Sequence, residues 1–252
     1  MKLFKRTSIF LIIFIALVWT AVITLIEYPE DHIRVTDVEI KQTRQLLEKN
    51  NIEVSDKLLK KSVHSIKTAS VENRFENAEA AAEKIVGSGA AKSSDGTYIS
   101  GSVSMSEKDG ELFVSGTLDG YSDKSSALTR ARKLVSSFAL AYDEMEAHVY
   151  EKDDTVSISL IPQIDGKNVF DCPINITISP NGAYKLEAKP VTFSKNGREL
   201  VKSPCSALAE LAGAETANGL TVTDMNIGYK VKDGAAYPVW EIVTADGGRY
   251  YV

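Results

Sequence analysis

The chain has 252 residues, of which 44% are hydrophobic and 25% charged, and its net charge at pH 7 is −5. This composition is ordinary for a globular protein with a hydrophobic core, and the length leaves room for one large or two small domains. The acidic balance argues against a nucleic-acid partner, which would favour a basic surface.

The first predicted element is a membrane span from Ser8 to Ile26, which contains no charged residue. As a helix, residues 9–26 would extend for about 27 Å, close to the ~30 Å apolar thickness of a bilayer. Basic residues precede this run and acidic residues follow it, so residues 1–7 are predicted to be cytoplasmic. The sequence therefore predicts a single-pass protein of the cell membrane whose C-terminal region is extracytoplasmic.

A cleaved signal peptide is the alternative interpretation of the same run. It requires an apolar stretch of about 7–15 residues followed by a small-residue cleavage site. The apolar run is longer than that, and Glu27, Tyr28 and Pro29 follow it. The pattern favours a retained anchor.

The next region, residues 27–50, contains a predicted membrane-proximal helix. Thr36 and Glu39 have the spacing of a capping box, in which each side chain bonds the backbone of the other residue. Good helix formers follow, and Asn50 and Asn51 can end the helix in a left-handed conformation.

Three further helices are predicted beyond this region. Alanines and glutamates favour a helix over 76–87, which Gly87 would end. Residues 124–146 place apolar side chains at helical spacing on one face. Ser203 and Pro204 begin a third helix, as N-cap and first residue. The apolar face of 124–146 consists of Leu128, Ala131, Leu134, Val135, Phe138, Ala141, Tyr142 and Met145.

Strands are predicted from alternating apolar residues between turn signals. The turns include 107–110, 180–182 and 246–248, and Pro238 suggests an edge position or a strand start. The predicted strands are 97–105, 111–118, 155–164, two within 172–193, 220–231, 236–245 and 249–252, with one or two short ones within 52–74.

A helix thus precedes antiparallel strands three times, which predicts an α+β fold in which helices cover one face of a sheet. Residues 51–252 form the predicted extracytoplasmic α+β region. It is either one unit or two subdomains, about 51–120 and 121–252, with a boundary near 195–203 as another option. The repeated units are 76–87 with 97–118, 124–146 with 155–193, and 204–212 with 221–252.

The two cysteines are Cys172 and Cys205. In an oxidising compartment they could form one disulfide. Their separation in sequence does not determine their separation in space, so a free pair of thiols is the alternative.

No pattern in the chain indicates catalysis. The histidines, His32, His64 and His148, stand far apart and match no zinc-binding spacing. Asp153, Asp154 and Asp165 lack the spacing of a calcium loop and are better interpreted as turn residues. Nucleophile-elbow and phosphate-loop motifs are missing from the sequence. The chain is therefore predicted to have no catalytic, cofactor-binding or metal-binding residue.

The order of these elements resembles that of the YycI family of regulatory proteins from Gram-positive bacteria. The likeness includes QLLEKNNIEV after the span and AEAAAEKIVGSG before a strand pair, and the terminal YPVWEIVTADGGRYYV carries most of it. The pattern resembles, more loosely, the PepSY-like modules found outside bacterial membranes. The resemblance implies helix-plus-antiparallel-sheet repeats of the PepSY or YycI kind.

The resemblance also implies a non-enzymatic role. Members of the family act with a sister membrane protein, YycH, to modulate a WalK/YycG-like sensor histidine kinase that governs cell-wall metabolism. The coupling is expected to involve the transmembrane helices and association of the outer domains. Small and polar residues specify helix contacts in lipid, so Ser8, Ala16, Thr20 and Thr24 are the predicted partner-binding residues.

An alternative from another class is a membrane-anchored PepSY-type binding or inhibitory module that acts on an extracytoplasmic peptidase. A soluble fragment from about residue 35 onward would suffice for that role and would fail for the first. A wall enzyme is the weakest option, because no nucleophile, metal or acid–base motif supports it.

Overall fold

A computed structural model describes residues 32–33, 35–118, 121, 124–214 and 217–252. The predicted cytoplasmic residues 1–7 and the predicted span, with Ser8, Ala16, Thr20 and Thr24, lie outside the described residues. Within the described part, no helix is both long enough and apolar enough to cross a membrane.

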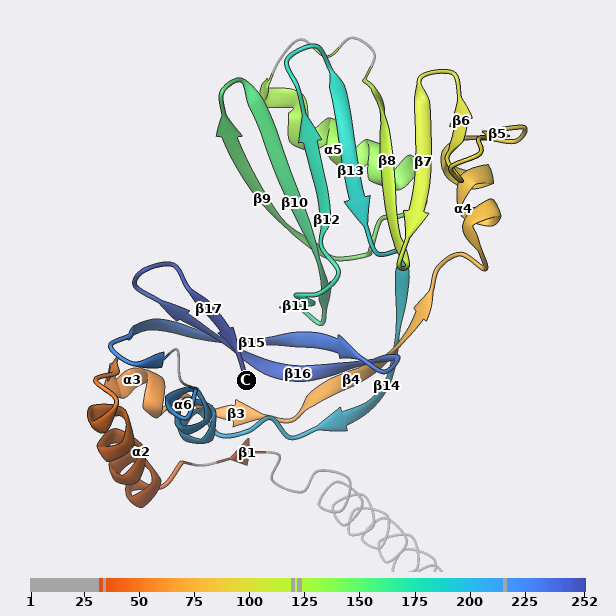
Figure 1. The fold of residues 1–252 in the computed structure, drawn as a ribbon. Helices are drawn as coiled ribbons and strands as arrows, with labels where there is room; N and C mark the ends of the chain where they lie inside the picture. The colour runs from red at the N-terminus through yellow and green to blue at the C-terminus, as the bar shows by residue number, and fades with distance from the viewer. Residues whose placement is uncertain (1–31, 34, 119–120, 122–123, 215–216) are drawn as a thin grey trace, which may run out of the picture.

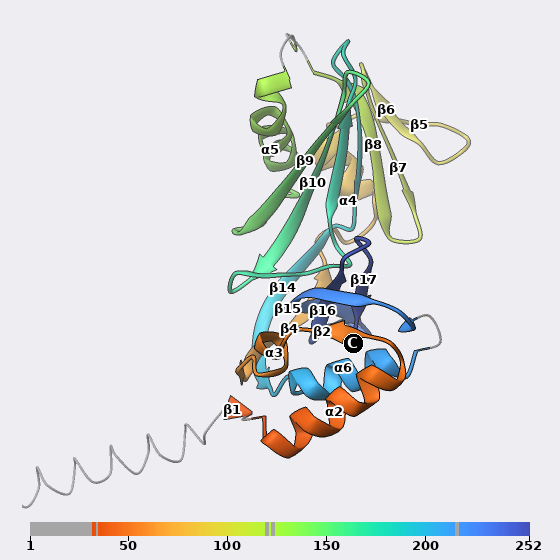
Figure 2. The ribbon, with the colours of Figure 1, turned by 90° about the vertical axis from the view of Figure 1, so that its left-hand side faces the viewer.

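The described chain forms two large sheets, each with its own helices, and one small two-stranded sheet (Figure 1). The six-stranded unit has the strand order β14-β4-β16-β15-β2, and β17 pairs with β16. The helices α2 and α6 pack on each other beneath this sheet (Figure 2). Its elements are α2 (Asp37–Lys49), β2 (Glu53–Val54), α3 (Asp56–Leu59), β4 (Ile66–Asn73), β14 (Val191–Glu199), α6 (Pro204–Ala212), β15 (Thr221–Lys232), β16 (Ala235–Thr244) and β17 (Arg249–Tyr251), with the small pair β1 (His32–Ile33) and β3 (Val63–His64) beside them.

The nine-stranded unit has the order β11-β10-β12-β13-β8-β7-β6-β5, and β9 also pairs with β10. The helices α4 and α5 share one hydrophobic core with the buried face of this sheet. Its elements are α4 (Ala78–Ile85), β5 (Ala91–Lys92), β6 (Tyr98–Ser100), β7 (Val103–Lys108), β8 (Glu111–Thr117), the 3-10 turn η1 (Lys124–Ser126), α5 (Ala127–Ser137), β9 (Met145–Lys152), β10 (Thr155–Ile164), β11 (Lys167–Asn168), β12 (Ile174–Ile178) and β13 (Ala183–Ala188).

Local capping signals in the sequence are confirmed at two helices of the six-stranded unit, α2 and α6. In α2 the Thr36 side chain accepts from the Glu39 amide, and the Glu39 carboxylate accepts from the Thr36 amide at 2.8 Å. In α6 the Ser203 hydroxyl accepts from the Ser206 amide, and proline occupies the first turn. These bonds satisfy amides that would otherwise lack partners at the helix starts.

The predicted helix over 124–146 is too long. The α-helix ends at Ser137, Ala139 adopts a left-handed backbone with φ 55°, and β9 begins at Met145. The Ser137 hydroxyl donates to the Leu134 carbonyl, which favours the end of a helix over its continuation. Residues 145–152 pair with β10 along their whole length, so tertiary pairing overrides the helical periodicity there.

The predicted strand over 97–105 is in fact two strands. Gly101 adopts φ 58°, and the chain reverses there between β6 and β7. The first two predicted helix-and-strand repeats also share one sheet, while the third joins α2, β2 and β4 in the other. The α+β class is confirmed as a mixed fold of helices packed on antiparallel sheets.

Two hydrophobic cores underlie the two units. One includes Trp240, Tyr229 and Leu47 and draws on both ends of the described chain. The other lies between Phe75 and Ala188. The chain crosses from one core to the other after β4 and again after β13. The subdomain boundary suggested near residue 120 falls between β8 and α5, which contribute to the same core, and the domain bounds stay a prediction.

Candidate functional site: a polar groove between the sheets

The segment that joins β10 to β12 connects the two units. Val169 forms a bridge with Tyr229 of β15, and the Phe170 amide donates to the Tyr229 carbonyl at 2.9 Å. Ile164, Val169 and Cys172 are buried in the core of the six-stranded unit, although the strands that flank them belong to the other sheet. The two units are therefore packed together through a shared piece of core.

Polar contacts extend this junction along β15. The Asp171 carboxylate accepts from the Val231 amide at 2.8 Å and lies 3.4 Å from the Lys230 ammonium. The Phe170 ring lies against the Tyr251 ring, with centroids 4.7 Å apart. The junction thus combines apolar packing with a charge-assisted hydrogen bond to the backbone.

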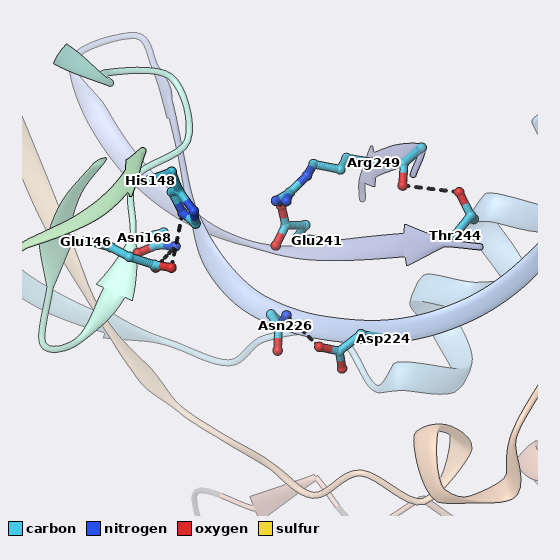
Figure 3. Close-up of polar contacts among 9 residues, drawn as sticks. Glu146, His148, Asn168, Asp224, Asn226, Glu241, Thr244 and Arg249 are labelled. Atoms are coloured by element: carbon cyan, nitrogen blue, oxygen red, sulfur yellow. Dashed lines mark hydrogen bonds and ion pairs between the residues drawn. The ribbon is translucent and has the colours of Figure 1, made fainter. Parts of the chain in front are cut away.

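A groove of about 580 Å³ opens beside this junction. One wall comes from the lower ends of β9, β10 and β11, and the other from β15, β16 and β17 (Figure 3). Its lining residues are Lys61, Glu146, His148, Gln163, Gly166, Lys167, Asn168, Phe170, Asp224, Asn226, Ile227, Glu241, Val243 and Arg249.

A chain of hydrogen bonds orders the first wall. The Gln163 side-chain amide donates to Asn168 at 2.8 Å, and Asn168 donates to the Glu146 carboxylate at 2.6 Å. The His148 imidazole lies 3.1 Å from the other Glu146 oxygen. Glu146 therefore holds two neighbours at once and presents a polar surface to the groove.

Glu241 and Arg249 define the second wall. The Glu241 side chain is only 6% exposed, whereas its ion-pair partner Arg249 is 54% exposed. The hydrogen bond to Glu241 raises the pKa of Arg249, so the guanidinium stays charged at the groove surface. Figure 3 shows the two side chains pointing toward each other from β16 and β17.

Asp224 carries the remaining negative charge of this wall. Partial burial opposes its ionisation, but hydrogen bonds from the Met225 amide at 2.8 Å and from Asn226 at 3.0 Å lower its pKa overall. Lys61 lies 4.0 Å away. The carboxylate is therefore ionised at neutral pH.

The groove presents charged and amide side chains beside the apolar side chains of Phe170, Ile227 and Val243. Its acidic groups already have partners. Within the described part of the chain, no group of three or more His, Cys, Asp or Glu residues is placed to hold a metal ion. The arrangement gives no positive sign of catalysis.

A second groove of about 540 Å³ lies on the other side of the β10–β11 hairpin. Arg74 organises it, because its guanidinium donates to the carbonyls of Ala139 at 2.6 Å, Ala141 at 2.9 Å and Val191 at 3.1 Å. The same guanidinium lies 4.7 Å from the centre of the Tyr142 ring. Arg74 thereby joins both chain crossings to the loop between α5 and β9.

The hairpin tip is also tied to the six-stranded unit by charge. Asp165 pairs with Lys195 and lies 3.1 Å from Lys67. The hydrogen bonds from Lys195 and Lys67 lower the pKa of Asp165. The sequence predicted only a turn residue at Asp165. It gave no sign of this role, because both lysines come from distant strands.

Cys172 and Cys205 are buried in the same core as free thiols, so the suggested disulfide is not formed in the structure. Burial raises the pKa of Cys172 to about 11 and also raises that of Cys205. Asp153 and Asp154 form the turn between β9 and β10, with φ of 49° and 62°. Of the three histidines, His148 alone lines the groove.

The fold and the groove define an α+β protein of two packed units with a polar cleft at their junction. The sequence model of the family described as "YycI protein" matches residues 30–252. The chain belongs to the YycI family, and this assignment supports a regulatory role in a two-component system.

Solved structures resemble the chain only distantly. They include an uncharacterized protein from Eubacterium rectale (13% identity, TM-score 0.41, covering 80% of this chain and 89% of that one). YycH from Bacillus subtilis shows 9% identity and a TM-score of 0.49 over 76% of this chain and 57% of its own. The YpeB C-terminal domain from Bacillus megaterium shows 9% identity and a TM-score of 0.35 over 87% and 92%. No curated protein matches the sequence.

Proposed function

We propose that the chain is a single-pass membrane protein that modulates a sensor histidine kinase controlling cell-wall metabolism, together with a YycH-like sister protein. The observation that carries this proposal is the family match over residues 30–252, which begins directly after the predicted span Ser8–Ile26. In this proposal the N-terminus is cytoplasmic and the two packed units are extracytoplasmic.

The span provides the contact with the kinase. Apolar side chains gain nothing from leaving lipid for another apolar helix, so specificity in the bilayer depends on close packing and on polar groups. Ser8, Ala16, Thr20 and Thr24 supply these features. Ala16, Thr20 and Thr24 are four residues apart and so share one helix face.

The outer region provides the contact with the sister protein. The shared core and the contacts of Asp171 and Asp165 hold the two units together, so a partner bound to one unit can bias the position of the other. This rigid coupling supports a protein that relays binding outside the membrane to its own span.

The span is tested by exchange for an unrelated apolar helix of the same length in the source bacterium. We expect the exchange to abolish regulation of the kinase target genes while the membrane level of the protein is unchanged. A paired Ala16→Leu and Thr20→Leu variant should reproduce the loss, because the larger side chains block close approach. Val18→Leu, on the opposite face, is the matched control.

Normal regulation by the exchanged span would contradict the proposal. Activity of a soluble fragment of residues 35–252 would support the PepSY-type inhibitory module instead, because that role requires only the outer region.

A further inference from the structure

The outer edge of β9 is a long and regular strand edge. All eight residues, Met145–Lys152, pair in unbroken antiparallel register with β10, from Met145 opposite Pro162 to Lys152 opposite Thr155. Among the described residues, no strand pairs with the other side of β9. Figures 1 and 2 show β9 at the margin of its sheet.

The hydrogen-bond pattern identifies which backbone groups this edge presents. The Gln163 amide donates to the Glu144 carbonyl at 3.0 Å, which extends the same antiparallel register by one hydrogen-bonded pair. Hydrogen-bonded and non-bonded pairs alternate in antiparallel ladders. The backbone groups of even-numbered residues of β9 therefore face β10, and the amides and carbonyls of Ala147 and Val149 point outward.

The other strand edges are short or irregular, whereas β9 is long and regular and carries its charged residues, Glu146, Glu151 and Lys152, toward its two ends. The strands β2 and β5 have two residues each, and β17 has three. The long edge strand β14 has a register shift between Lys195 and Gly197, and its second half is charged and exposed. Short length, bulges and charge are the usual means by which proteins prevent edge pairing.

The side chains of β9 suit an added strand. The central residues 147–150, Ala-His-Val-Tyr, include no carboxylate, lysine or arginine, and Val149 and Tyr150 are 43% and 64% exposed. Val149 lies opposite the buried Ile158 and so on the helix-covered face, whereas Tyr150 lies opposite Ser157 on the polar face. An incoming strand would therefore need apolar side chains on one face and polar ones on the other.

A second copy of this chain does not fit the edge under the proposed membrane anchoring. Antiparallel pairing of β9 with its own copy turns the copy by 180°, and β9 runs away from the junction toward the far end of the nine-stranded unit. The first described strand, β1, lies at the opposite end of the molecule (Figures 1 and 2). The two N-termini would then point away from each other and could not enter the same membrane.

We propose that the outer edge of β9 binds an extended, alternating apolar–polar strand of the sister extracytoplasmic protein, which continues the nine-stranded sheet by strand addition. This inference rests on the proposed function, because it takes the YycH-like sister as the partner. The outward amides and carbonyls of residues 147 and 149 supply the main-chain hydrogen bonds. Val149 and Tyr150 contact the partner's side chains on the two faces.

Proline scanning of the edge tests the proposal with both full-length proteins co-expressed and solubilised from membranes. Val149→Pro removes an outward amide and spares the hydrogen bonds to β10, so we expect at least about tenfold less sister protein captured. Ala147→Pro should act in the same way. Val149→Thr keeps the amide and the β-branched shape, and it should bind as the wild type does.

Hydrogen exchange of the wild-type complex provides a second test that no folding defect can affect. In the free protein the amides of Ala147 and Val149 should exchange faster than those of His148 and Tyr150. In the complex the amides of Ala147 and Val149 should slow by at least about tenfold, while those of His148 and Tyr150 change little.

The outcomes separate the two proposals. Undiminished capture by both proline variants, or unchanged exchange at residues 147 and 149 in the complex, would overturn strand addition and leave the proposed function intact. A wild-type protein that captures no sister protein would overturn both.

Discussion

Glu79 shows how one exposed carboxylate can join a helix to a sheet. It accepts from the Lys92 ammonium at 2.9 Å and from the Tyr98 hydroxyl at 2.7 Å, and so ties α4 to β5 and β6. The hydrogen bonds from Lys92 and Tyr98 lower the pKa of Glu79 to about 2. A carboxylate whose pKa is lower in the folded than in the unfolded state stabilises the fold only while it is ionised.

We expect Glu79→Gln to lower the urea midpoint at neutral pH. The stabilising effect of Glu79 is fully present above its unfolded pKa of 4.5 and is lost as the pH falls toward about 2. The midpoint difference between wild type and variant should therefore be constant above pH 5 and shrink to nothing near pH 2. Glu83→Gln, at another exposed position of α4, is the control. A difference that is the same at pH 3 and pH 7 would contradict the assignment.

Arg74 is a residue whose contacts could not be predicted from the sequence. Its three carbonyl partners lie 65, 67 and 117 residues along the chain. No spacing rule relates an arginine to backbone atoms at such separations, so the sequence contained no signal for this clamp. The same holds for Glu241 and His148, which line the same groove only because the two units pack together.

At the scale of elements, the connection between β10 and β12 packs closely against β15, which is possible because Gly228 has no side chain. A Cβ atom at Gly228 would lie 2.4 Å from the Phe170 ring and 2.6 Å from the Asn168 carbonyl oxygen. Both distances are far below van der Waals contact, so any larger residue must displace the connection from β15.

Gly228→Ala should destabilise the protein by about 1–3 kcal/mol, the usual cost of overpacking. The expected measurement is a lower free energy of unfolding in urea with an unchanged far-UV spectrum. Gly213→Ala is the matched control, since its Cβ would lie 3.4 Å from its nearest neighbour and its backbone is helical. If both variants had equal stability, the close packing of Phe170 on β15 would not matter.

Elements with local signals were predicted well, and those decided by distant pairing were not. The caps at Thr36 and Ser203 and the alternation of β10 are confirmed. The predicted helix over 124–146 is wrong beyond its observed end at Ser137, because Ala139 turns the chain with a positive φ and the last two residues, Met145 and Glu146, pair with β10 instead. Pro238 lies inside β16. It falls between Ala235–Ala236, where β16 pairs with β4, and Glu241, where the pairing of β16 with β17 begins.

At the scale of the whole molecule, the two cores are linked by shared residues. Ile164, the last residue of β10, and Val169, in the connection to β12, are 2% and 0% exposed within the other core. Separation of the units would expose these side chains together with Cys172, which costs about 1.5–3 kcal/mol for each large apolar side chain. The units are therefore expected to unfold as one.

The test compares two probes of urea unfolding in full-length protein carrying Trp19→Phe. Fluorescence then reports on Trp240, which is fully buried in one core, while far-UV circular dichroism reports on both sheets. Coincident transitions are expected for a single cooperative unit. A second transition, visible in circular dichroism and silent in fluorescence, would show that the nine-stranded unit unfolds alone.

The sequence by itself determined the features that depend on near neighbours. The apolar run Ser8–Ile26, the helix caps, the turn residues and the strand alternation follow from hydropathy and backbone preferences over a few residues. The order of elements was also enough to indicate the family, which the match over residues 30–252 confirms.

Only the tertiary structure decided how those elements combine. Strand order, the merging of two repeats into one sheet, the free edge of β9 and the groove between Glu146 and Glu241 all depend on residues far apart in the chain. Backbone hydrogen bonds are alike for every strand pair, so local sequence cannot choose among them. The choice is made by the burial of apolar faces in two joined cores.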